Sequence, residues 1–403
     1  MSWRRLELLP PRCDLGPARG RVPYRRSLRW LRALPRRVPL LCAAASLLTS
    51  PWGPAGSALA EPPPRRALIL CVGDGFGWGA LSIAEQLLEG STLLAGAEAV
   101  GALRTNAYDE PVTDSAAAAT AMATGQRTRN AWLALHPETR APLETLAEAA
   151  LERGLAVGLV TTSGITHATP AAFAAHGPDR YDHDPIAEQM ASLGLDMMAG
   201  GDRAYFLPRS SGGLRADDRN LLHELRMDGA VIAETLALAR AADPNRPLVF
   251  LYAETDPPYA GPDRPPLEEM LDLALERLSR DADGFFLLVE GAQIDWAEHD
   301  KDASKLPAEL AEFDQTVSRA RLFAQARGNT AVVVVADHDT GGPAPLAAGS
   351  SGKDLEIRFL TDTHTALLVP VLVTGGPARD WARQRHLKDL GSAMREWLLE
   401  EKP

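Results

Sequence analysis

An Asp-Ser pair at positions 114 and 115 is the part of this sequence best suited to do chemistry. The pair stands directly before a run of small residues with high helix propensity, within PVTDSAAAATAMATGQRTRN at 111–130. The run ends at Gly125, so the sequence predicts a short helix with Ser115 in its first turn. A serine exposed at a helix N-terminus faces unpaired N–H groups and the positive end of the dipole, which suits a phosphoryl group on its oxygen. The plainer alternative is that Thr113, Asp114 or Ser115 only caps the helix.

Acidic residues and histidines follow several apolar runs that have the length of buried strands. The runs and the residues at their ends are ALILCV at 67–72 before Asp74, GFFLLVE at 284–290 ending in Glu290, and AVVVVA at 331–336 before Asp337 and His338. Ligands of open α/β sheets bind beyond the carboxyl ends of the strands. These side chains are therefore expected to lie together at one edge of a sheet.

The spacing of further ligand-type residues indicates metal ions at this edge. Asp295 and His299 are four residues apart, so they share one face if their segment is helical. Asp337 and His338 are adjacent and can converge on one ion. Carboxylates with neutral imidazoles, about three to a site, suit Zn²⁺ with an open position, whereas a Glu with a hydroxyl and a shared Asp suits Mg²⁺. Each residue alone has an ordinary structural explanation, and only their combination indicates a metal centre.

In motif order and spacing from Asp74 to His364, the chain resembles the alkaline phosphatase family. The motifs are V-G-D-G, T-D-S-A-A-x-A-T-A, H-A-T-P-A-A, V-E-G-x-x-I-D-x-x-x-H, A-D-H-x-T-G-G and a late T-H-T. The resemblance implies a phosphate monoester hydrolase in which Ser115 is the nucleophile and forms a phosphoserine intermediate, with two zinc ions and one magnesium ion. The ligand sets that it implies are Asp295, His299 and His364 for one zinc, Asp74, Asp337 and His338 for the other, and Asp74, Thr169 and Glu290 for magnesium.

The resemblance also implies residues that surround the phosphate and the metals. Arg180 lies thirteen residues after His167, the place of the family's phosphate-clamping arginine, and a guanidinium can hold two phosphoryl oxygens. The alternative for Arg180 is a surface salt bridge in the charged DRYDHD run. Position 167 is His where some relatives have Asp, and position 296 is Trp where others have Lys or His. Together with Asp114, His167 and Trp296 are expected just outside the ligand sets, and they leave the identity of the third metal open.

Strand-like and helix-like segments alternate through most of the chain. This alternation predicts a single large α/β domain, a three-layer sandwich with a mostly parallel central sheet and helices on both faces. Besides the runs above, the expected strands are 155–162, 195–199, 246–252 and 366–373, and the expected helices are 142–153, 184–193, 266–280, 307–327 and 386–399. Another helix is expected with Thr169 as its N-cap and Pro170 at its first position.

Three other segments carry specific expectations. Pro370 interrupts 366–373, which is therefore expected as an edge or late strand. The segment 343–360 is rich in Gly and Ser and is expected to be irregular. The stretch 203–265 is the one sizeable candidate for a small insertion into the catalytic domain at 61–403.

The first 60 residues form a basic leader. They contain eleven arginines and two acidic residues, whereas the whole chain has a net charge of −11. An apolar run at 38–48 and the A-L-A at 58–60 predict a secretory signal, too short to span a membrane. Arg25 and Arg26 leave two routes open, a twin-arginine signal or an ordinary signal from about Arg32 after an over-long start. An exported protein, periplasmic or secreted, is expected, without a membrane span in the mature chain or nucleic acid as its main partner.

The remaining expectations concern cysteines, assembly and alternatives. Only Cys71 remains after the leader, as a core residue, so no internal disulfide can form. The resemblance implies that a homodimer can form. A phosphodiesterase or other hydrolase of the same wider superfamily is an alternative function, and a non-catalytic metal- or phosphate-binding protein is another. His136, His183 and His223 are expected as surface histidines without a role.

Overall fold

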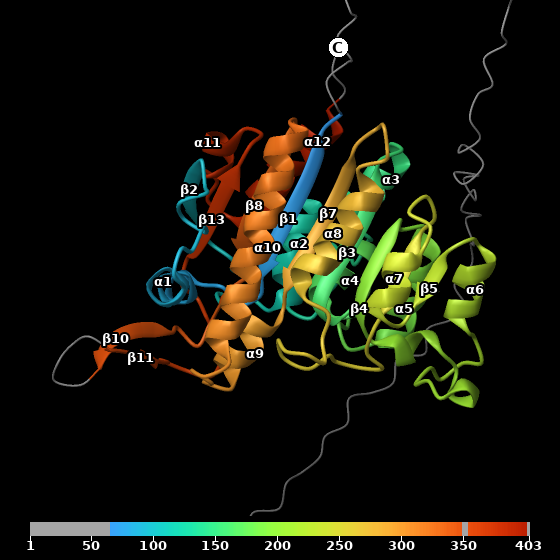
Figure 1. Ribbon diagram of the computed structural model, residues 1–403, viewed down its shortest axis with the longest axis horizontal. Coiled ribbons are helices and arrows are strands. Elements are labelled where there is room, and N and C mark those ends of the chain that lie inside the picture. The colour runs from blue at the N-terminus through green and yellow to red at the C-terminus, as the bar shows by residue number, and fades with distance from the viewer. Residues whose placement is uncertain (1–64, 349–353, 401–403) are drawn as a thin grey trace, which may run out of the picture. The chain divides into compact units, whose positions relative to one another are not determined.

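A nine-stranded sheet forms the middle of the protein, in the order β2-β13-β8-β1-β7-β3-β4-β6-β5 (Figure 1). The computed structural model describes residues 65–348 and 354–400, so the leader prediction lies outside the described residues. The strands of the sheet are β1 Ala67–Gly73, β2 Ala99–Leu103, β3 Ala156–Gly164, β4 Met197–Gly201, β5 Val231–Ala233, β6 Leu248–Leu251, β7 Phe285–Gly291, β8 Thr330–Ala336 and β13 Val369–Thr374. All neighbours are parallel except at β13, which runs antiparallel to β2 and β8.

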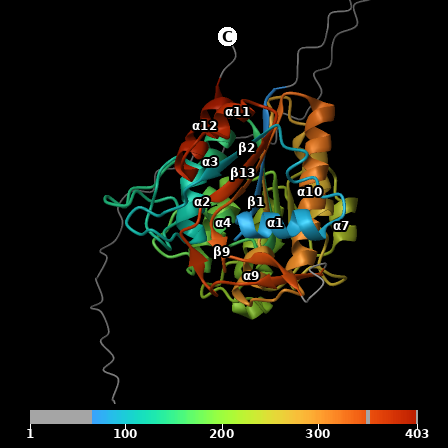
Figure 2. The same cartoon turned by 90° about the vertical axis from the view of Figure 1, so that its left-hand side faces the viewer.

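Helices cover both faces of this sheet, which confirms the predicted three-layer sandwich. In Figure 1, α8 and α10 lie in front of the sheet and α2 and α4 lie behind it, and Figure 2 shows the sheet between these layers. The helices are α1 Trp78–Leu87, α2 Ser115–Thr124, α3 Leu146–Glu152, α4 Ala168–Ala174, α5 His183–Leu193, α6 Leu221–Met227, α7 Leu236–Ala241, α8 Leu267–Leu278, α9 Gln293–His299, α10 Leu306–Arg327, α11 Ala378–Trp381 and α12 Leu387–Leu399, with short 3-10 turns at Arg203–Phe206 and Arg209–Ser211. No helix among the described residues is long and apolar enough to cross a membrane.

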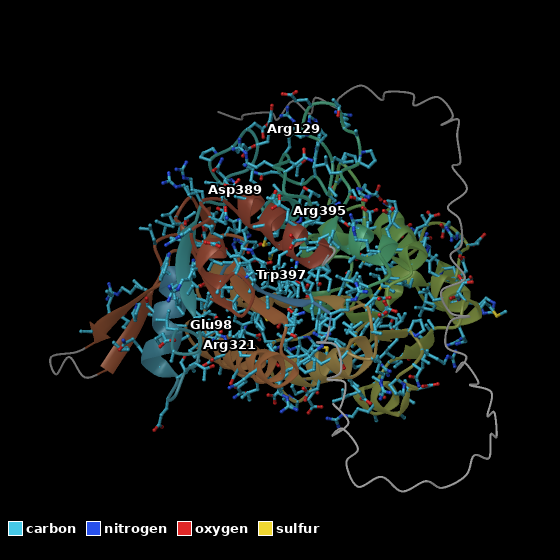
Figure 3. The ribbon with its side chains drawn as sticks, turned by 90° about the horizontal axis from the view of Figure 1, so that it is seen from above. Glu98, Arg129, Arg321, Asp389, Arg395 and Trp397 are labelled. Carbon is cyan, nitrogen blue, oxygen red and sulfur yellow. The ribbon has the colours of Figure 1, made fainter. Side chains whose placement is uncertain are left out.

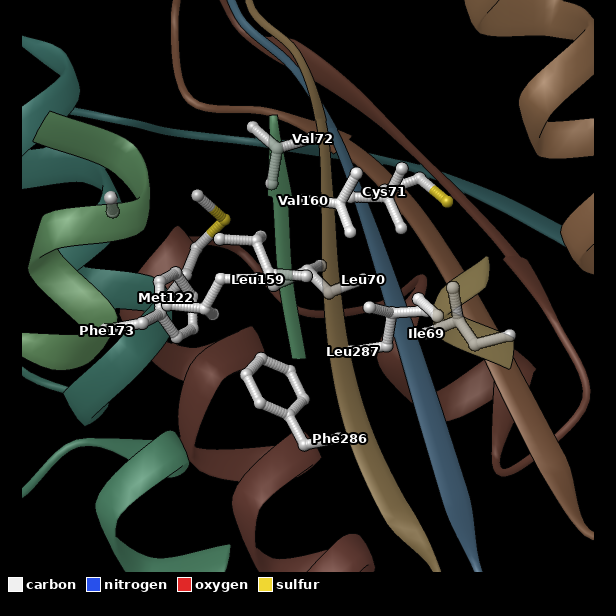
Figure 4. Close-up of a cluster of buried hydrophobic side chains, with 14 of the residues drawn as sticks. Ile69, Leu70, Cys71, Val72, Met122, Leu159, Val160, Phe173, Phe286 and Leu287 are labelled. Atoms are coloured by element: carbon white, nitrogen blue, oxygen red, sulfur yellow. The ribbon is translucent and has the colours of Figure 1, made fainter. Parts of the chain in front are cut away.

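The central strands are apolar along their whole length because both of their faces are buried. Figure 4 shows the alternation: Leu70 and Phe286 point toward α2 and α4, while Ile69 and Cys71 point to the other face. The rings of Phe286 and Phe173 stack with centroids 5.5 Å apart. Cys71 is fully buried with a free thiol, as predicted, and burial raises its pKa to about 12.

The structure differs from the sequence-based prediction at the start of α4. Its N-cap is His167, not Thr169, and Thr169 and Pro170 are already inside the first turn. Amide groups in a first helical turn have no partner within the helix, so a proline is tolerated at more than one position there. The predicted cap at Thr169 was therefore wrong by two residues.

The predictions for the end of the chain were only partly right. Strand β13 is a late strand, the last in chain order, but it is not at an edge, since it lies between β2 and β8. Its ladder with β8 begins at Val371, so Pro370 has a strand partner only in β2 and no ladder hydrogen bond to β8 is lost. The supposedly irregular segment 343–360 contains an antiparallel hairpin of β10 Ala344–Ala348 and β11 Asp354–Arg358, which extends from the body in Figure 1.

Residues 203–265 continue the main sheet, because β5 and β6 follow β4 in its order. A proline-rich loop connects β6 to α8. The small pair of β9 Asp339–Thr340 and β12 His364–Thr365 lies outside the main sheet. Its register sets His364 opposite Thr340.

The two ends of the sheet carry different kinds of side chains. Figure 3 views the end at which β1 begins, with Trp397 of α12 and Arg321 of α10 among its side chains. Trp397 packs edge-on against Trp381 at 5.4 Å, and the Arg66 guanidinium lies 5.3 Å from its ring centroid. The acidic residues and histidines predicted as ligands lie at the opposite end of the sheet, beyond the carboxyl ends of its parallel strands.

Helix α12 fixes the position of α2 through a close approach at Gly391. A Cβ built on Gly391 would lie 2.5 Å from the backbone oxygens of both Ala121 and Met122 in α2. Such a distance is too short for a carbon and a backbone oxygen. Glycine is therefore required where the two helices cross.

The Gly391→Ala variant should lower the free energy of unfolding by about 1–3 kcal/mol, the usual cost of overpacking. Helix propensity alone predicts the opposite, a gain of about 1 kcal/mol. Urea unfolding measures which effect is larger, with Glu396→Ala on the exposed side of the same helix as the control, expected within about 0.5 kcal/mol of the wild type. A stabilised Gly391→Ala protein would contradict the close packing.

Candidate active site

The register of three adjacent strands gathers carboxylates at one end of the sheet. Val72 of β1 pairs with Glu290 of β7, and Gly73 pairs with Ala336 of β8. Asp74 and Asp337 follow these strands directly, so they emerge at the same end of the sheet as Glu290, two residues further along. The structure thus brings together the residues that the apolar runs predicted at one edge.

Ser115 lies at the first position of α2 and faces this cluster. Its Oγ is 3.2 Å from Nε2 of His338. The serine is only 4% exposed, which corrects the expectation of an exposed residue. The helix ends at Gly125 in the left-handed conformation at φ 72°, as predicted.

Asp114 is the N-cap of α2 and also orients Arg180. Its Oδ1 accepts the Ala117 amide at 2.9 Å, while its Oδ2 accepts the Ala131 amide at 2.9 Å and Arg180 Nη1 at 3.1 Å. Arg180 is therefore paired with Asp114 and not with the acids of the DRYDHD run. Burial lowers the pKa of Arg180, but the charge and hydrogen bond of Asp114 raise it, and Asp74 adds a smaller contribution.

One predicted zinc ligand set, that of Asp74, Asp337 and His338, converges around the imidazole of His338. Its Nε2 is 3.2 Å from Asp337 Oδ2 and 3.5 Å from Asp74 Oδ1, and all three residues are buried. The same imidazole also has a ligand atom within 4.8 Å of Asp295 and His364. His338 thus lies between two groups of potential ligands.

The other predicted zinc ligand set, that of Asp295, His299 and His364, also converges. Helix α9 places Asp295 and His299 one turn apart, with Asp295 Oδ1 3.3 Å from His299 Nε2. His364 comes from the separate strand β12, and its Nε2 is 3.2 Å from His299 Nε2 and 3.7 Å from Asp295 Oδ1. These separations suit three ligands around one ion.

The third set is made of oxygen donors. Thr169 lies close enough to Glu290 to lower the pKa of that carboxyl, although burial raises it more. Oγ1 of Thr169 and Oδ1 of Asp74 are buried without a hydrogen-bond partner in the described part of the chain. Glu290 Oε2 accepts the Thr161 hydroxyl at 2.5 Å.

The charge balance of the site fits bound cations. Burial and the neighbours Asp337, Asp295 and Glu290 raise the pKa of Asp74 well above its ordinary value, and burial with similar neighbours raises the pKa of Asp337 to about 8. Burial lowers the pKa of His338, helped by His364 and Arg180. Carboxylate oxygens and an imidazole nitrogen thus face one another, and a divalent cation between them would satisfy all of these acceptors. The residues present fit the implied metals.

The other nitrogen of each histidine is held by an acceptor. Nδ1 of His299 is 2.7 Å from the carbonyl of Asp362, and Nδ1 of His364 is 2.9 Å from the carbonyl of Thr113. A carbonyl can only accept, so we infer that both protons are on Nδ1 and that both Nε2 lone pairs point into the site. This is the usual outer arrangement of metal-binding histidines.

Thr340 holds the Nδ1 nitrogen of His338 in the same way. This residue was not selected from the sequence. Its Oγ1 donates to Asp295 Oδ1 at 2.5 Å and lies 3.1 Å from His338 Nδ1. Its single proton goes to the carboxylate, so the hydroxyl accepts from Nδ1–H of His338. Thr340 therefore connects the two predicted zinc ligand sets. The A-D-H-x-T-G-G motif contained this threonine, but only the fold shows what it touches.

The predicted outer residues His167 and Trp296 lie side by side, with ring centroids 5.9 Å apart. His167 Nε2 is 2.8 Å from Oδ1 of Asp256, a residue that sequence reasoning did not select. Asp256, Asp202 and Glu290 raise the pKa of His167 more than burial lowers it.

The three histidines expected on the surface have different surroundings. His183 departs from that expectation, because it is half-buried, with its ring stacked on Tyr205 at 4.2 Å and Nδ1 2.8 Å from Thr166 Oγ1. His136 is half-buried and His223 is exposed.

Comparison with known proteins agrees with this geometry. The family model described as "Alkaline phosphatase" matches residues 65–365. Alkaline phosphatase 3 of Bacillus subtilis is 37% identical over 58% of this chain, and the chain spans 50% of that protein and 61% of Alkaline phosphatase 4 of the same organism. Streptomycin-6-phosphate phosphatase of Streptomyces griseus is 31% identical, with 91% of this chain and 95% of that protein covered.

Solved structures extend the similarity to the fold. The alkaline phosphatase of the Antarctic bacterium TAB5 superposes with a TM-score of 0.76 at 31% identity, covering 85% of this chain and 99% of that one. A variant of that enzyme, in which one histidine is replaced by glutamate, has Mg bound in its M3 site. The enzyme of Thermus thermophilus gives a TM-score of 0.75 at 25% identity, covering 88% of this chain and 97% of that one.

The Thr340→Val variant should bind divalent metal about 10–100-fold more weakly, because the proton of His338 and the orientation of Asp295 both depend on the lost hydroxyl. Thr340→Ser keeps the hydroxyl and should remain near the wild type. Equilibrium dialysis against buffered zinc measures this without any substrate. Equal zinc affinity of the valine and wild-type proteins would contradict the assigned role.

Protein stripped of metal should lose stability as the pH rises from about 4 to 8. Asp337 has its pKa raised from 3.8 to about 8, so across this window the folded protein holds a proton that the unfolded chain has released. Unfolding therefore becomes more favourable until about pH 8, above which Asp337 adds no further change. Urea titrations in chelator at pH 5 and pH 8 test the sign, with zinc-loaded protein as the comparison. Greater stability of the stripped protein at pH 8 than at pH 5 would contradict this charge arrangement.

Proposed function

Because this chain belongs to the alkaline phosphatase family, we propose that it hydrolyses phosphate monoesters with Ser115 as the nucleophile. The observation that carries the proposal is the placement of the Ser115 oxygen 3.2 Å from His338 Nε2, within a buried group of ligand-type side chains. Ser115 is buried at the first position of a helix and faces a group of carboxylates and a histidine that can bind cations. This placement supports a role beyond capping the helix. The capping role itself belongs to Asp114.

Two zinc ions and one magnesium ion are the cofactors that we propose. One zinc would be held by Asp295, His299 and His364, the second by Asp74, Asp337 and His338, and magnesium by Asp74, Thr169 and Glu290. Such ions, when bound, lower the pKa of hydroxyl and water ligands and offset the negative charge of a phosphoryl group. The magnesium found in the TAB5 variant supports an oxygen-rich third site.

The chain's own residues bind and orient the phosphoryl group. Phosphoryl transfer depends mainly on positioning and on neutralising charge, and Arg180 can contact two phosphoryl oxygens through its planar guanidinium. Asp114 Oδ2 accepts a hydrogen bond from that guanidinium at 3.1 Å, so the Arg180 side chain is already ordered before the substrate binds. The Ala117 amide is already donated to Asp114, which leaves the amides of Ser115 and Ala116 to meet the substrate at the helix N-terminus.

The reaction then has two displacements at phosphorus. In the first, the Ser115 oxygen forms a bond to phosphorus while the bond to the substrate's ester oxygen breaks, and the alcohol leaves with a proton. In the second, water attacks the phosphoserine and the Ser115–phosphorus bond breaks, releasing phosphate. Both steps use the same Arg180 contacts, since the three peripheral oxygens stay on the phosphorus atom.

The alternatives are weaker on this structure. A diester would leave one oxygen blocked by its second alcohol, whereas Arg180 is arranged for a group with free oxygens. An inactive binding protein would not need a nucleophile so close to a ligand cluster. Export through the arginine-rich leader, with a periplasmic or secreted location, and assembly as a homodimer belong to the same proposal.

The Ser115→Ala variant should lose at least ~10³-fold in kcat/KM for an aryl monophosphate, because the group that attacks phosphorus is gone. Its metal content should stay near that of the wild type, since Ser115 is outside the three ligand sets. Ser192→Ala, on an exposed position of α5, is the matched control and should be fully active.

Rates for an aryl monophosphate, diester and sulfate, with and without chelator, complete this experiment. Monoester hydrolysis that the chelator abolishes supports the proposal. Full activity of Ser115→Ala, or a preference for the diester or the sulfate, would overturn it.

A further inference from the structure

The loop after β6, residues 252–266, reaches the candidate magnesium site through one carboxylate. Asp256 Oδ1 lies 2.8 Å from His167 Nε2, and the side chains of this pair are 51% and 27% exposed. His167 is the N-cap of α4 and only two residues before Thr169, which is in the proposed third ligand set. The pair is therefore partly open to solvent and next to this ligand set along the chain.

The backbone of His167 is fixed, whereas its ring direction is set by neighbours. The His167 amide donates to the Gly164 carbonyl at 3.0 Å, and its carbonyl accepts the Ala171 amide at 2.9 Å. The ring lies 5.9 Å from that of Trp296 and makes its polar contact with Asp256. Removing that contact would leave the imidazole free to turn about its side-chain bonds.

Asp256 is presented by a well-anchored piece of loop. The residue before it, Thr255, accepts the Asp202 amide at 3.1 Å through its carbonyl. The residue after it, Pro257, accepts Gln293 Nε2 at 2.9 Å through its carbonyl. With both neighbours held, the carboxylate does not depend on His167 for its own position.

Imidazole at the third site would change which metal the site prefers. Carboxylate and hydroxyl oxygens with water suit Mg²⁺, whereas an imidazole nitrogen shifts a site toward Zn²⁺ and similar ions. Among the described residues, the clusters of potential metal ligands do not include His167. Nε2 of His167 is instead bound by Asp256.

We propose that Asp256 selects the metal of the third site. By binding His167 Nε2, it keeps this imidazole out of the ligand set of Asp74, Thr169 and Glu290, which stays all-oxygen and prefers Mg²⁺ over Zn²⁺. The inference rests on the proposed function, because it takes the third set to be a metal site. It adds a residue from a loop remote in sequence from all three ligands.

The test uses the full chain, stripped with chelator and dialysed against buffered mixtures of Zn²⁺ and Mg²⁺. Metals per chain are then measured by elemental analysis. The Asp256→Ala variant should raise the ratio of zinc to magnesium at the third site by about tenfold or more, the usual size of an outer-residue effect. Loading with Co²⁺ gives a second readout, since a new nitrogen ligand changes the visible absorption of cobalt.

Two further variants make the result specific. Glu254→Ala removes a carboxylate from the same loop that pairs with Arg203 and not with His167, so its metal ratio should match the wild type. The double variant Asp256→Ala, His167→Ala should also return to the wild-type ratio, because the competing imidazole is absent.

The outcomes separate this inference from the proposed function. If the wild type fails to hold two zinc ions and to hydrolyse the monoester, both are overturned. If it does both, but Asp256→Ala has a third-site ratio within twofold of the wild type, only the role of Asp256 is overturned. A ratio that still rises in the double variant would overturn it as well.

Discussion

The repulsion among buried carboxylates at the ends of β7, β1 and β8 is the constraint on which the site depends. Asp74, Glu290 and Asp337 emerge at the same end of the sheet because the strands pair in register, and Asp295 joins them from α9. Burial raises the pKa values of the first three, repulsion from neighbouring carboxylates adds to the rise for Asp74 and Asp337, and Arg180 lowers the pKa of Asp74 and Glu290. A divalent cation between these carboxylates would offset their repulsion, and the sheet holds them in place for it.

Around this cluster, neutral groups set the direction of each ligand. The backbone carbonyls of Thr113 and Asp362 fix two histidines, and the hydroxyl of Thr340 fixes the third. Thr113 directly precedes Asp114 and Ser115, so the segment that presents Ser115 also orients His364. Ser115, Arg180 and the proposed metal ligands are thus connected through short polar contacts of this segment.

Much of this arrangement could be predicted from the sequence, for physical reasons. Fully apolar runs indicate strands buried on both faces, and the carboxylates that follow such strands must meet at one edge. The helix at Ser115 was predictable from small residues between a capping Asp and a glycine. The α4 cap was placed wrongly because a proline fits several positions of a first turn. Strand β13 was expected as an edge or late strand, and the edge alternative was wrong because Pro370 does not indicate where the neighbouring strands begin to pair.

The outer residues could not be found in this way. Thr340 and Asp256 are single polar residues in a two-residue strand and a loop, where such residues are common, and each has a partner 45 or more positions away. The hairpin of β10 and β11 was hidden by its glycines and serines. Local pattern thus located the ligands, while the groups that orient them required the tertiary structure.

The position of β13 has a consequence for the order of assembly. Strand β2 at 99–103 meets the sheet only through β13 at 369–374, and the helix that carries Ser115 rests against α12 at 387–399. Contacts between segments so distant in sequence form late and slowly during folding. While the protein is being synthesised, the helix that begins at Ser115 therefore lacks its support until these later residues have emerged, and the candidate active site is complete only in the finished fold.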